Sequence, residues 1–139
     1  LSKGFTNITL IDLSPTLVNK ISAEFSADFG KEIKVICGDF FEHKSTYDLI
    51  IEQTFFCAIP PEMRANYATK MNEILNAKGK IAGLLFDFPL TEEGPPYGGL
   101  KDEYLSLFSE KFIIKTIEKA HNSIKPRQNK ELFFIFEKK

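Results

Sequence analysis

The hydrophobic residues of this 139-residue chain fall into short runs separated by polar, glycine-rich or proline-rich stretches. Runs of four to nine residues between such stretches are typical of β-strands. We expect strands over 7–12, 32–40, 47–52, 80–88, 112–120 and 131–139. The runs at 47–52 and 80–88 are apolar on both faces, which is typical of strands inside a sheet.

Between the strands, apolar positions recur at helical spacing. Ser14 and Pro15 predict the start of a first helix, as N-cap and first helical position, and Gly30 predicts its end. Pro61 predicts the start of a second helix before Gly79. The buried stripe expected on it consists of Met63, Tyr67, Met71, Ile74 and Leu75.

A third helix is expected over 100–109, after a loop at 89–99 that is rich in glycine and proline. At the front of the chain, "LSKGF" resembles the last turn of a helix, with Gly4 as its C-terminal cap. The length of 139 residues predicts a single domain over 1–139, and the N-terminal turn leads us to expect that this domain is the C-terminal part of a longer protein.

Strands that alternate with helices predict an α/β fold with a doubly wound, mostly parallel sheet. No helix separates the runs at 112–120 and 131–139. These last two strands must therefore form an antiparallel pair at one edge of the sheet.

Composition narrows the function classes. The net charge is −1 and the charges are scattered, which argues against nucleic acid and anionic membrane as partners. The sequence contains no apolar run of membrane-spanning length and no visible signal peptide. Cys37 and Cys57 lack metal-ligand spacing, so we expect a reduced pair, a cytoplasmic protein and no metal.

Acidic residues close two of the predicted strands. Ligands of such sheets bind at the carboxyl ends of the strands, where Asp12 and Asp39 stand. A carboxylate there can accept hydrogen bonds from both hydroxyls of a ribose, and a second one from the adenine amine. Two local roles remain open: Asp12 could cap the helix together with Ser14, and Asp39 could be a solvated turn acid.

Longer motifs point to a family. An acid after one strand, "GDFF" after the next and an antiparallel last pair resemble a class I S-adenosylmethionine-dependent methyltransferase. "FFCAIPPEMR" and "GPPYGG" resemble the thiopurine S-methyltransferase family, and within it the branch of halide and thiol methyltransferases. The resemblance covers residues 4–139. It implies S-adenosylmethionine as methyl donor and a small thiol, halide or thiocyanate as acceptor.

The resemblance also implies roles for single residues. For the cofactor, Asp12 would bind the ribose, Asp39 and the backbone of Phe40 the adenine, and Gln53 and Thr54 the methionyl part. The thiopurine enzymes carry an arginine where this chain has Gln53, a departure that argues against thiopurines as acceptors. The family's first strand and glycine-rich loop have no counterpart before Asp12, so the sequence lacks half of the family's cofactor site.

For the acceptor, Phe55, Phe56 and Tyr97 would form the pocket wall, and Arg127 with Tyr97 would act on the nucleophile. Core packing under the next helix remains an alternative for Phe55 and Phe56, and an exposed loop charge for Arg127. We interpret Cys57 as a small buried residue rather than a nucleophile. The alternative function is a nucleoside-binding or interaction domain without turnover; a dehydrogenase fits the fold only.

Overall fold

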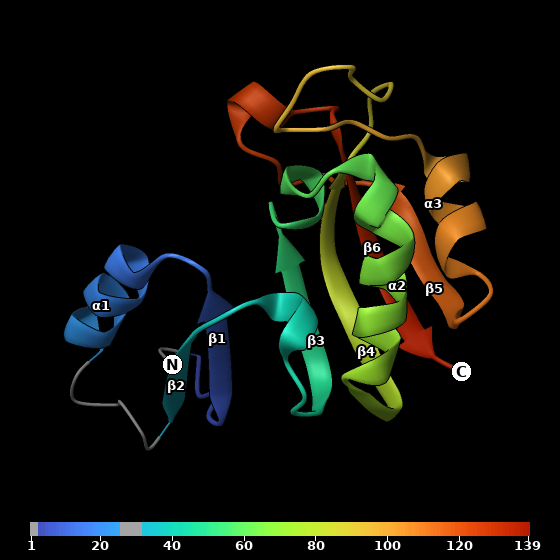
Figure 1. Ribbon diagram of the computed structural model, residues 1–139. Helices are drawn as coiled ribbons and strands as arrows, with labels where there is room; N and C mark the ends of the chain where they lie inside the picture. Colours follow the sequence, from blue (N-terminus) through green and yellow to red (C-terminus); the bar gives the residue numbers. More distant parts are fainter. Residues whose placement is uncertain (1–2, 26–31) are drawn as a thin grey trace. The chain divides into compact units, whose positions relative to one another are not determined.

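The computed structural model describes residues 3–25 and 32–139, and the chain divides into two compact units, 1–44 and 45–139. Each unit has its own β-sheet (Figure 1). The expectation of a single domain therefore stays a prediction. No helix among the described residues combines the length and the apolar character needed to cross a membrane.

The first unit is a strand–helix–strand motif. β1 (Ile8–Asp12) and β2 (Ile33–Cys37) pair in parallel, and α1 (Pro15–Glu24) connects them. The predicted helix start is confirmed, because the Ser14 side chain accepts a hydrogen bond from the Leu17 N–H at 3.3 Å. The predicted end at Gly30 lies outside the described residues, as do Leu1 and Ser2 of the expected N-terminal helical turn.

The strand expected over 32–40 ends earlier, at Cys37. The Asp39 side chain accepts a hydrogen bond from the Phe41 N–H at 2.8 Å and caps the 3₁₀ turn η1 (Phe40–Glu42). Local capping therefore replaces strand pairing at this point, and it turns the chain at the carboxyl end of the sheet.

The second unit contains a four-stranded sheet in the order β3-β4-β6-β5. Its strands are β3 (Tyr47–Gln53), β4 (Leu75–Phe86), β5 (Phe112–Lys119) and β6 (Glu131–Lys138). β3 and β4 are parallel, and β6 runs antiparallel to β4 and β5. The α/β fold class with an antiparallel last strand is thus confirmed. The interior position expected for 47–52 is wrong within this sheet, because β3 lies at its edge and leaves Leu49 and Ile51 exposed.

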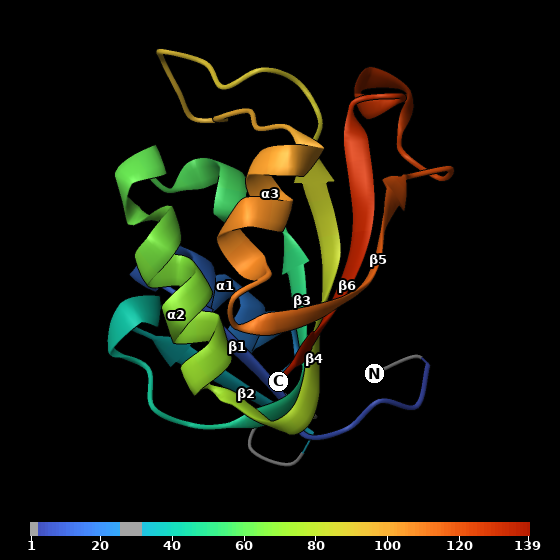
Figure 2. The ribbon, with the colours of Figure 1, turned by 90° about the vertical axis from the view of Figure 1, so that its right-hand side faces the viewer.

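Helices α2 (Arg64–Glu73) and α3 (Lys101–Phe108) lie on one face of this sheet (Figure 2). Pro61 begins a 3₁₀ turn, η3 (Pro61–Met63), rather than the α-helix itself. Much of the phenylalanine content is found in the core between the helices and the sheet. Its largest fully buried aromatic residues are Phe56, Tyr67, Tyr104, Phe108, Phe112, Phe134 and Phe136.

The expectation that Leu75 belongs to the second helix is wrong. The helix ends at Glu73, and β4 begins at Leu75 instead of at residue 80. Leu75 pairs with Tyr47 of β3, whose N–H donates to the Ile74 carbonyl at 2.9 Å. The register of β3 and β4 shifts after this first pair.

Candidate active site

A buried carboxylate organises the turn that follows β3. Glu52 is 3% exposed, and its Oε1 accepts hydrogen bonds from the N–H groups of Phe55 and Phe56 at 3.0 and 2.9 Å. Its Oε2 accepts from the Tyr67 hydroxyl at 2.7 Å, so the turn is also joined to α2. Burial raises the pKa of Glu52, although all three hydrogen bonds oppose that shift.

Our sequence analysis gave Glu52 no role. The available signal was a charged residue directly after the apolar run at 49–51 and within the same strand, because a carboxylate needs partners if it is buried.

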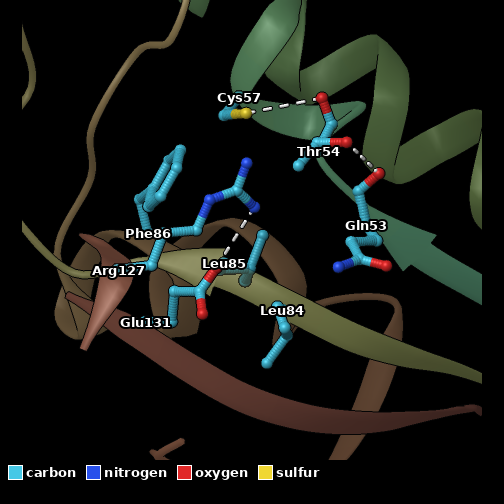
Figure 3. Close-up of a pocket in the computed structure, with 8 residues that line it drawn as sticks. All are labelled: Gln53, Thr54, Cys57, Leu84, Leu85, Phe86, Arg127 and Glu131. Atoms are coloured by element: carbon cyan, nitrogen blue, oxygen red, sulfur yellow. Dashed lines mark hydrogen bonds and ion pairs between the residues drawn. The ribbon is translucent and has the colours of Figure 1, made fainter. Parts of the chain in front are cut away.

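Thr54 gives the turn its direction. It has a φ of 64°, in the left-handed region that β-branched residues rarely adopt. Its hydroxyl donates to the Gln53 carbonyl at 2.6 Å, and its own carbonyl accepts from Cys57 Sγ at 3.4 Å. Gln53, Thr54 and Cys57 consequently line one pocket (Figure 3).

The pocket lies at the carboxyl ends of β3 and β4. Its lining consists of Gln53, Thr54, Cys57, Leu84, Leu85, Phe86, Arg127 and Glu131. The pocket is partly open to solvent, and the space within it is about 10 Å³, which is enough for a single water-sized group. The structure thus brings Gln53 and Thr54, expected near the cofactor, together with Arg127, expected near the acceptor.

Arg127 ends the 3₁₀ turn η4 (Lys125–Arg127) between β5 and β6. Its Nη1 lies 3.4 Å from Oε1 of Glu131, and its guanidinium carbon lies 5.5 Å from the Phe86 ring centroid. The side chain is 32% exposed and lines the pocket, so the alternative of a purely exposed loop charge does not describe it. The sequence analysis did not identify its partner Glu131, which is the first residue of β6.

Cys57 remains a protonated thiol at neutral pH. Burial and the nearby Glu52 carboxylate raise its pKa, and this effect exceeds the opposing one of Arg127. This supports the interpretation that Cys57 is not a nucleophile. Both cysteines are free thiols. Among the described residues, no three His, Cys, Asp or Glu side chains come together as metal ligands.

The aromatic residues expected in the pocket wall have different environments. Phe56 is 2% exposed and packs against Tyr67, Tyr104 and Phe108 at centroid distances of 5.0, 5.8 and 6.0 Å. Its expected contact with substrate is therefore corrected to a role in the core. Phe55 is half-buried, 6.1 Å from the Tyr67 ring.

The Tyr97 N–H donates to the Cys57 carbonyl at 2.8 Å, which joins the loop at 89–99 to the turn after β3. Phe55 and Tyr97 are not among the residues lining this pocket. Their acceptor-binding roles, and the catalytic role of Tyr97, stay predictions.

Asp12 and Asp39 belong to the first unit, at the carboxyl ends of the paired strands β1 and β2. Oδ1 of Asp12 accepts from the Ser14 N–H at 2.7 Å, and Oδ1 of Asp39 accepts from the Phe41 N–H. Each aspartate therefore has a local role: Asp12 bonds at the start of the helix, as the alternative expected, and Asp39, expected as a turn acid, caps the 3₁₀ turn η1. Each uses one carboxylate oxygen, so the cofactor roles of Asp12, Asp39 and Phe40 stay predictions.

Solved structures with this fold include a TehB-like SAM-dependent methyltransferase from Corynebacterium glutamicum. It matches with a TM-score of 0.68 at 16% identity, over 94% of this chain and 67% of that one. At this identity the similarity establishes the fold alone. It agrees with the class I methyltransferase architecture expected from the sequence.

Proteins of similar sequence identify the family, which the fold comparison does not. The chain is 31% identical over 125 residues to thiocyanate methyltransferase 1 of Brassica oleracea, covering 87% of this chain and 55% of the relative. It is 29% identical over 120 residues to thiopurine S-methyltransferase of Vibrio vulnificus, covering 85% and 55%. The chain thus spans about half the length of these curated relatives. The family model of thiopurine S-methyltransferase matches residues 3–139. The chain belongs to the thiopurine S-methyltransferase family.

Proposed function

We propose that this chain acts in methyl transfer from S-adenosylmethionine to a small thiol, halide or thiocyanate acceptor. The observation that carries the proposal is the pocket at the ends of β3 and β4, where the Arg127 guanidinium faces Cys57 between apolar walls (Figure 3). Relatives named for thiocyanate and thiopurine methylation support the same reaction class.

The residues of the first unit fit the adenosine part of the methyl donor. Asp12 and Asp39 close neighbouring parallel strands, and one oxygen of each is left by the capping bonds. A carboxylate in this position can accept from the two ribose hydroxyls, and the other from the adenine amine. When bound, S-adenosylmethionine supplies an activated methyl group, so the protein mainly has to orient the acceptor and exclude water.

The pocket at the ends of β3 and β4 suits a soft, compact nucleophile as methyl acceptor. A cavity of about 10 Å³ has room for about one water-sized group, so it suits the reacting atom of a small acceptor rather than a purine ring. The guanidinium of Arg127 attracts negative charge and lowers the pKa of a bound thiol. The apolar part of the pocket lining, which would contact the sulfur of a bound thiol, comes from Leu84, Leu85 and Phe86.

The Arg127→Ala variant of the full natural protein tests this proposal. We expect KM for a small thiol to rise about tenfold or more, because a charge-assisted contact contributes about 1.5–3 kcal/mol. The loss should shrink at higher pH, where the free thiol is already ionised, and Arg127→Lys should recover part of the activity. Methylated products are measured by mass spectrometry, with sulfide, iodide and thiocyanate as acceptors.

Lys125→Ala is the matched control, because Lys125 begins the same 3₁₀ turn, is exposed and does not line the pocket. Wild-type kinetics of the Arg127 variant would remove Arg127 from the site. Binding of S-adenosylmethionine without methylation of any acceptor would favour the alternative, a nucleoside-binding domain without turnover. The cytoplasmic location expected from the two reduced cysteines is part of this proposal.

A further inference from the structure

The pocket contains a charged group that the proposed function has not used, the carboxylate of Glu131. Its side chain is only 4% exposed. Glu131 pairs with Phe86 in the ladder between β4 and β6, and its carbonyl accepts from the Ala120 N–H at 3.0 Å. Sheet hydrogen bonds on both sides therefore fix the position from which this carboxylate reaches the pocket.

Glu131 is paired with the residue expected to attract the acceptor. Its Oε1 lies 3.4 Å from Nη1 of Arg127, while the other end of the guanidinium points toward Cys57 (Figure 3). Among the described residues that line the pocket, Arg127 and Glu131 carry the charges. A carboxylate this close offsets much of the guanidinium's attraction for an anion, since charges interact strongly where little water screens them.

We propose that Glu131 makes the pocket select acceptors that enter uncharged, namely small thiols, over permanent anions such as halide or thiocyanate. This inference rests on the proposed function of the same pocket. An anion beside Arg127 is attracted by the guanidinium and repelled by Glu131. A thiol enters without that repulsion, and its S–H can donate a hydrogen bond to the carboxylate.

The first test measures binding without turnover. Isotope-labelled thiocyanate is titrated into the full natural protein, and its affinity is obtained from NMR line broadening. Glu131→Gln keeps the shape of the side chain and removes the charge. We expect it to bind thiocyanate about tenfold more tightly than the wild type. An unchanged or weaker affinity would overturn the inference.

Glu137→Gln is the matched control, on the same strand. Glu137 pairs with Lys80 at 3.7 Å and with Lys115 at 3.8 Å, and it does not line the pocket. We expect this variant to bind thiocyanate as the wild type does. Equal tightening in both variants would mean that the general charge of the protein, not Glu131 in the pocket, controls anion affinity, and would refute the proposal.

The second test compares the two acceptor classes in turnover. Glu131→Gln should lower KM for thiocyanate about tenfold with little change in kcat, while KM for a small thiol stays the same or rises. A merely structural role of Glu131 would impair both acceptors together, and that result would contradict the proposal. If wild-type protein binds thiocyanate but methylates no acceptor, the proposed function fails, and the binding comparison still decides the role of Glu131.

A further variant covers the case in which Glu131→Gln does not fold. Arg127 is partly exposed, so Arg127→Gln is expected to fold, and it leaves Glu131 as the charge in the pocket. We expect thiocyanate binding to weaken about tenfold or more. Thiocyanate affinity equal to that of the wild type would show that the two charges do not control entry of anions, and the inference would be withdrawn.

Discussion

At the scale of single residues, Glu52 links the stability of the protein to the geometry of its pocket. Its carboxylate accepts three hydrogen bonds and has almost no contact with solvent. A buried carboxylate is tolerated only when its oxygens have such partners. Two of the donors belong to Phe55 and Phe56, so the same bonds fix the turn that carries Thr54 and Cys57 into the pocket.

Glu52→Ala should destabilise the protein by about 3 kcal/mol, because it leaves buried N–H and O–H donors unpaired. Glu52→Gln should cost only about 1 kcal/mol, since the amide oxygen can still accept from the two N–H groups. Glu62→Gln, at an exposed position of η3, is the control and should leave the free energy of unfolding unchanged. Urea denaturation measures the free energy of unfolding of these three variants and of the wild type.

The same variants test the raised pKa of Glu52. The unfolded chain ionises near the ordinary value of 4.5, whereas the folded protein holds the proton to higher pH. Between these two pKa values the folded state binds more protons, so the contribution of Glu52 to stability is full at low pH and falls as pH rises. The stability difference between wild type and Glu52→Gln should therefore shift against the wild type above about pH 4.5. A difference that stays constant from pH 4 to pH 8 would contradict the raised pKa.

The site residues differ in how far their positions and roles could be predicted from the sequence. Arg127 was expected near the acceptor from the family resemblance alone; it lines the pocket, and its role toward the acceptor stays a prediction. Glu131 and Glu52 were missed because their roles depend on burial and on cross-strand neighbours, which one sequence does not display. Phe56 was placed in the pocket wall although it lies in the core, because an aromatic residue after a strand fits either position.

At the scale of secondary-structure elements, β3 and β4 approach too closely for a side chain at one point. Gly83 faces Glu52 across the parallel pair, and an added Cβ would lie 1.9 Å from the Glu52 carbonyl oxygen. That oxygen belongs to a strand backbone and cannot rotate away. The close approach places Leu84 and Gln53, the next pair of the ladder, in the lining of the pocket.

Gly83→Ala should therefore destabilise the protein by about 3 kcal/mol, because the strands must separate to accommodate the methyl group. Gly38→Ala is the control: the nearest atom to its added Cβ would be Ile36 Cγ2 at 3.8 Å, an ordinary contact. Its effect on the unfolding free energy should be within about 0.5 kcal/mol. Thermal unfolding followed by circular dichroism compares the two, and equal stabilities would refute the proposed clash.

The order and type of the elements could be predicted, because strand and helix periods differ strongly in this chain. The residues at which helices and strands begin and end could be predicted less well. The end of α2 and the early start of β4 depend on pairing between Leu75 and Tyr47, which lie far apart in the sequence. Apolar residues at 74 and 75 fit the helical stripe equally well, so only the tertiary contact decides between helix and strand.

At the scale of the whole molecule, the buried residues are distributed unevenly between the two units. In the second unit, an aromatic core lies between α2, α3 and the sheet. Among the described residues of the first unit, Ile33 is the one buried hydrophobic residue. Segments with few buried apolar contacts open at lower free energy, so amides of β1 and β2 should exchange with solvent faster than those of β4 and β6.

This difference gives a direct test of the cofactor site. If Asp12 and Asp39 hold the adenosine of S-adenosylmethionine, binding must stabilise the ends of β1 and β2. A ligand at 100 times its Kd stabilises the binding-competent state by about 2.7 kcal/mol, so exchange there should slow by up to about 100-fold. Hydrogen exchange with and without S-adenosylmethionine, read by mass spectrometry on the full natural protein, measures the change at residues 12–14 and 38–41.

Asp12→Asn should reduce this protection, because an amide cannot accept from both ribose hydroxyls as a carboxylate does. Protection that spares β1 and β2, or that is equal in the variant, would place the adenosine elsewhere and leave Asp12 and Asp39 with the capping roles that the structure already gives them.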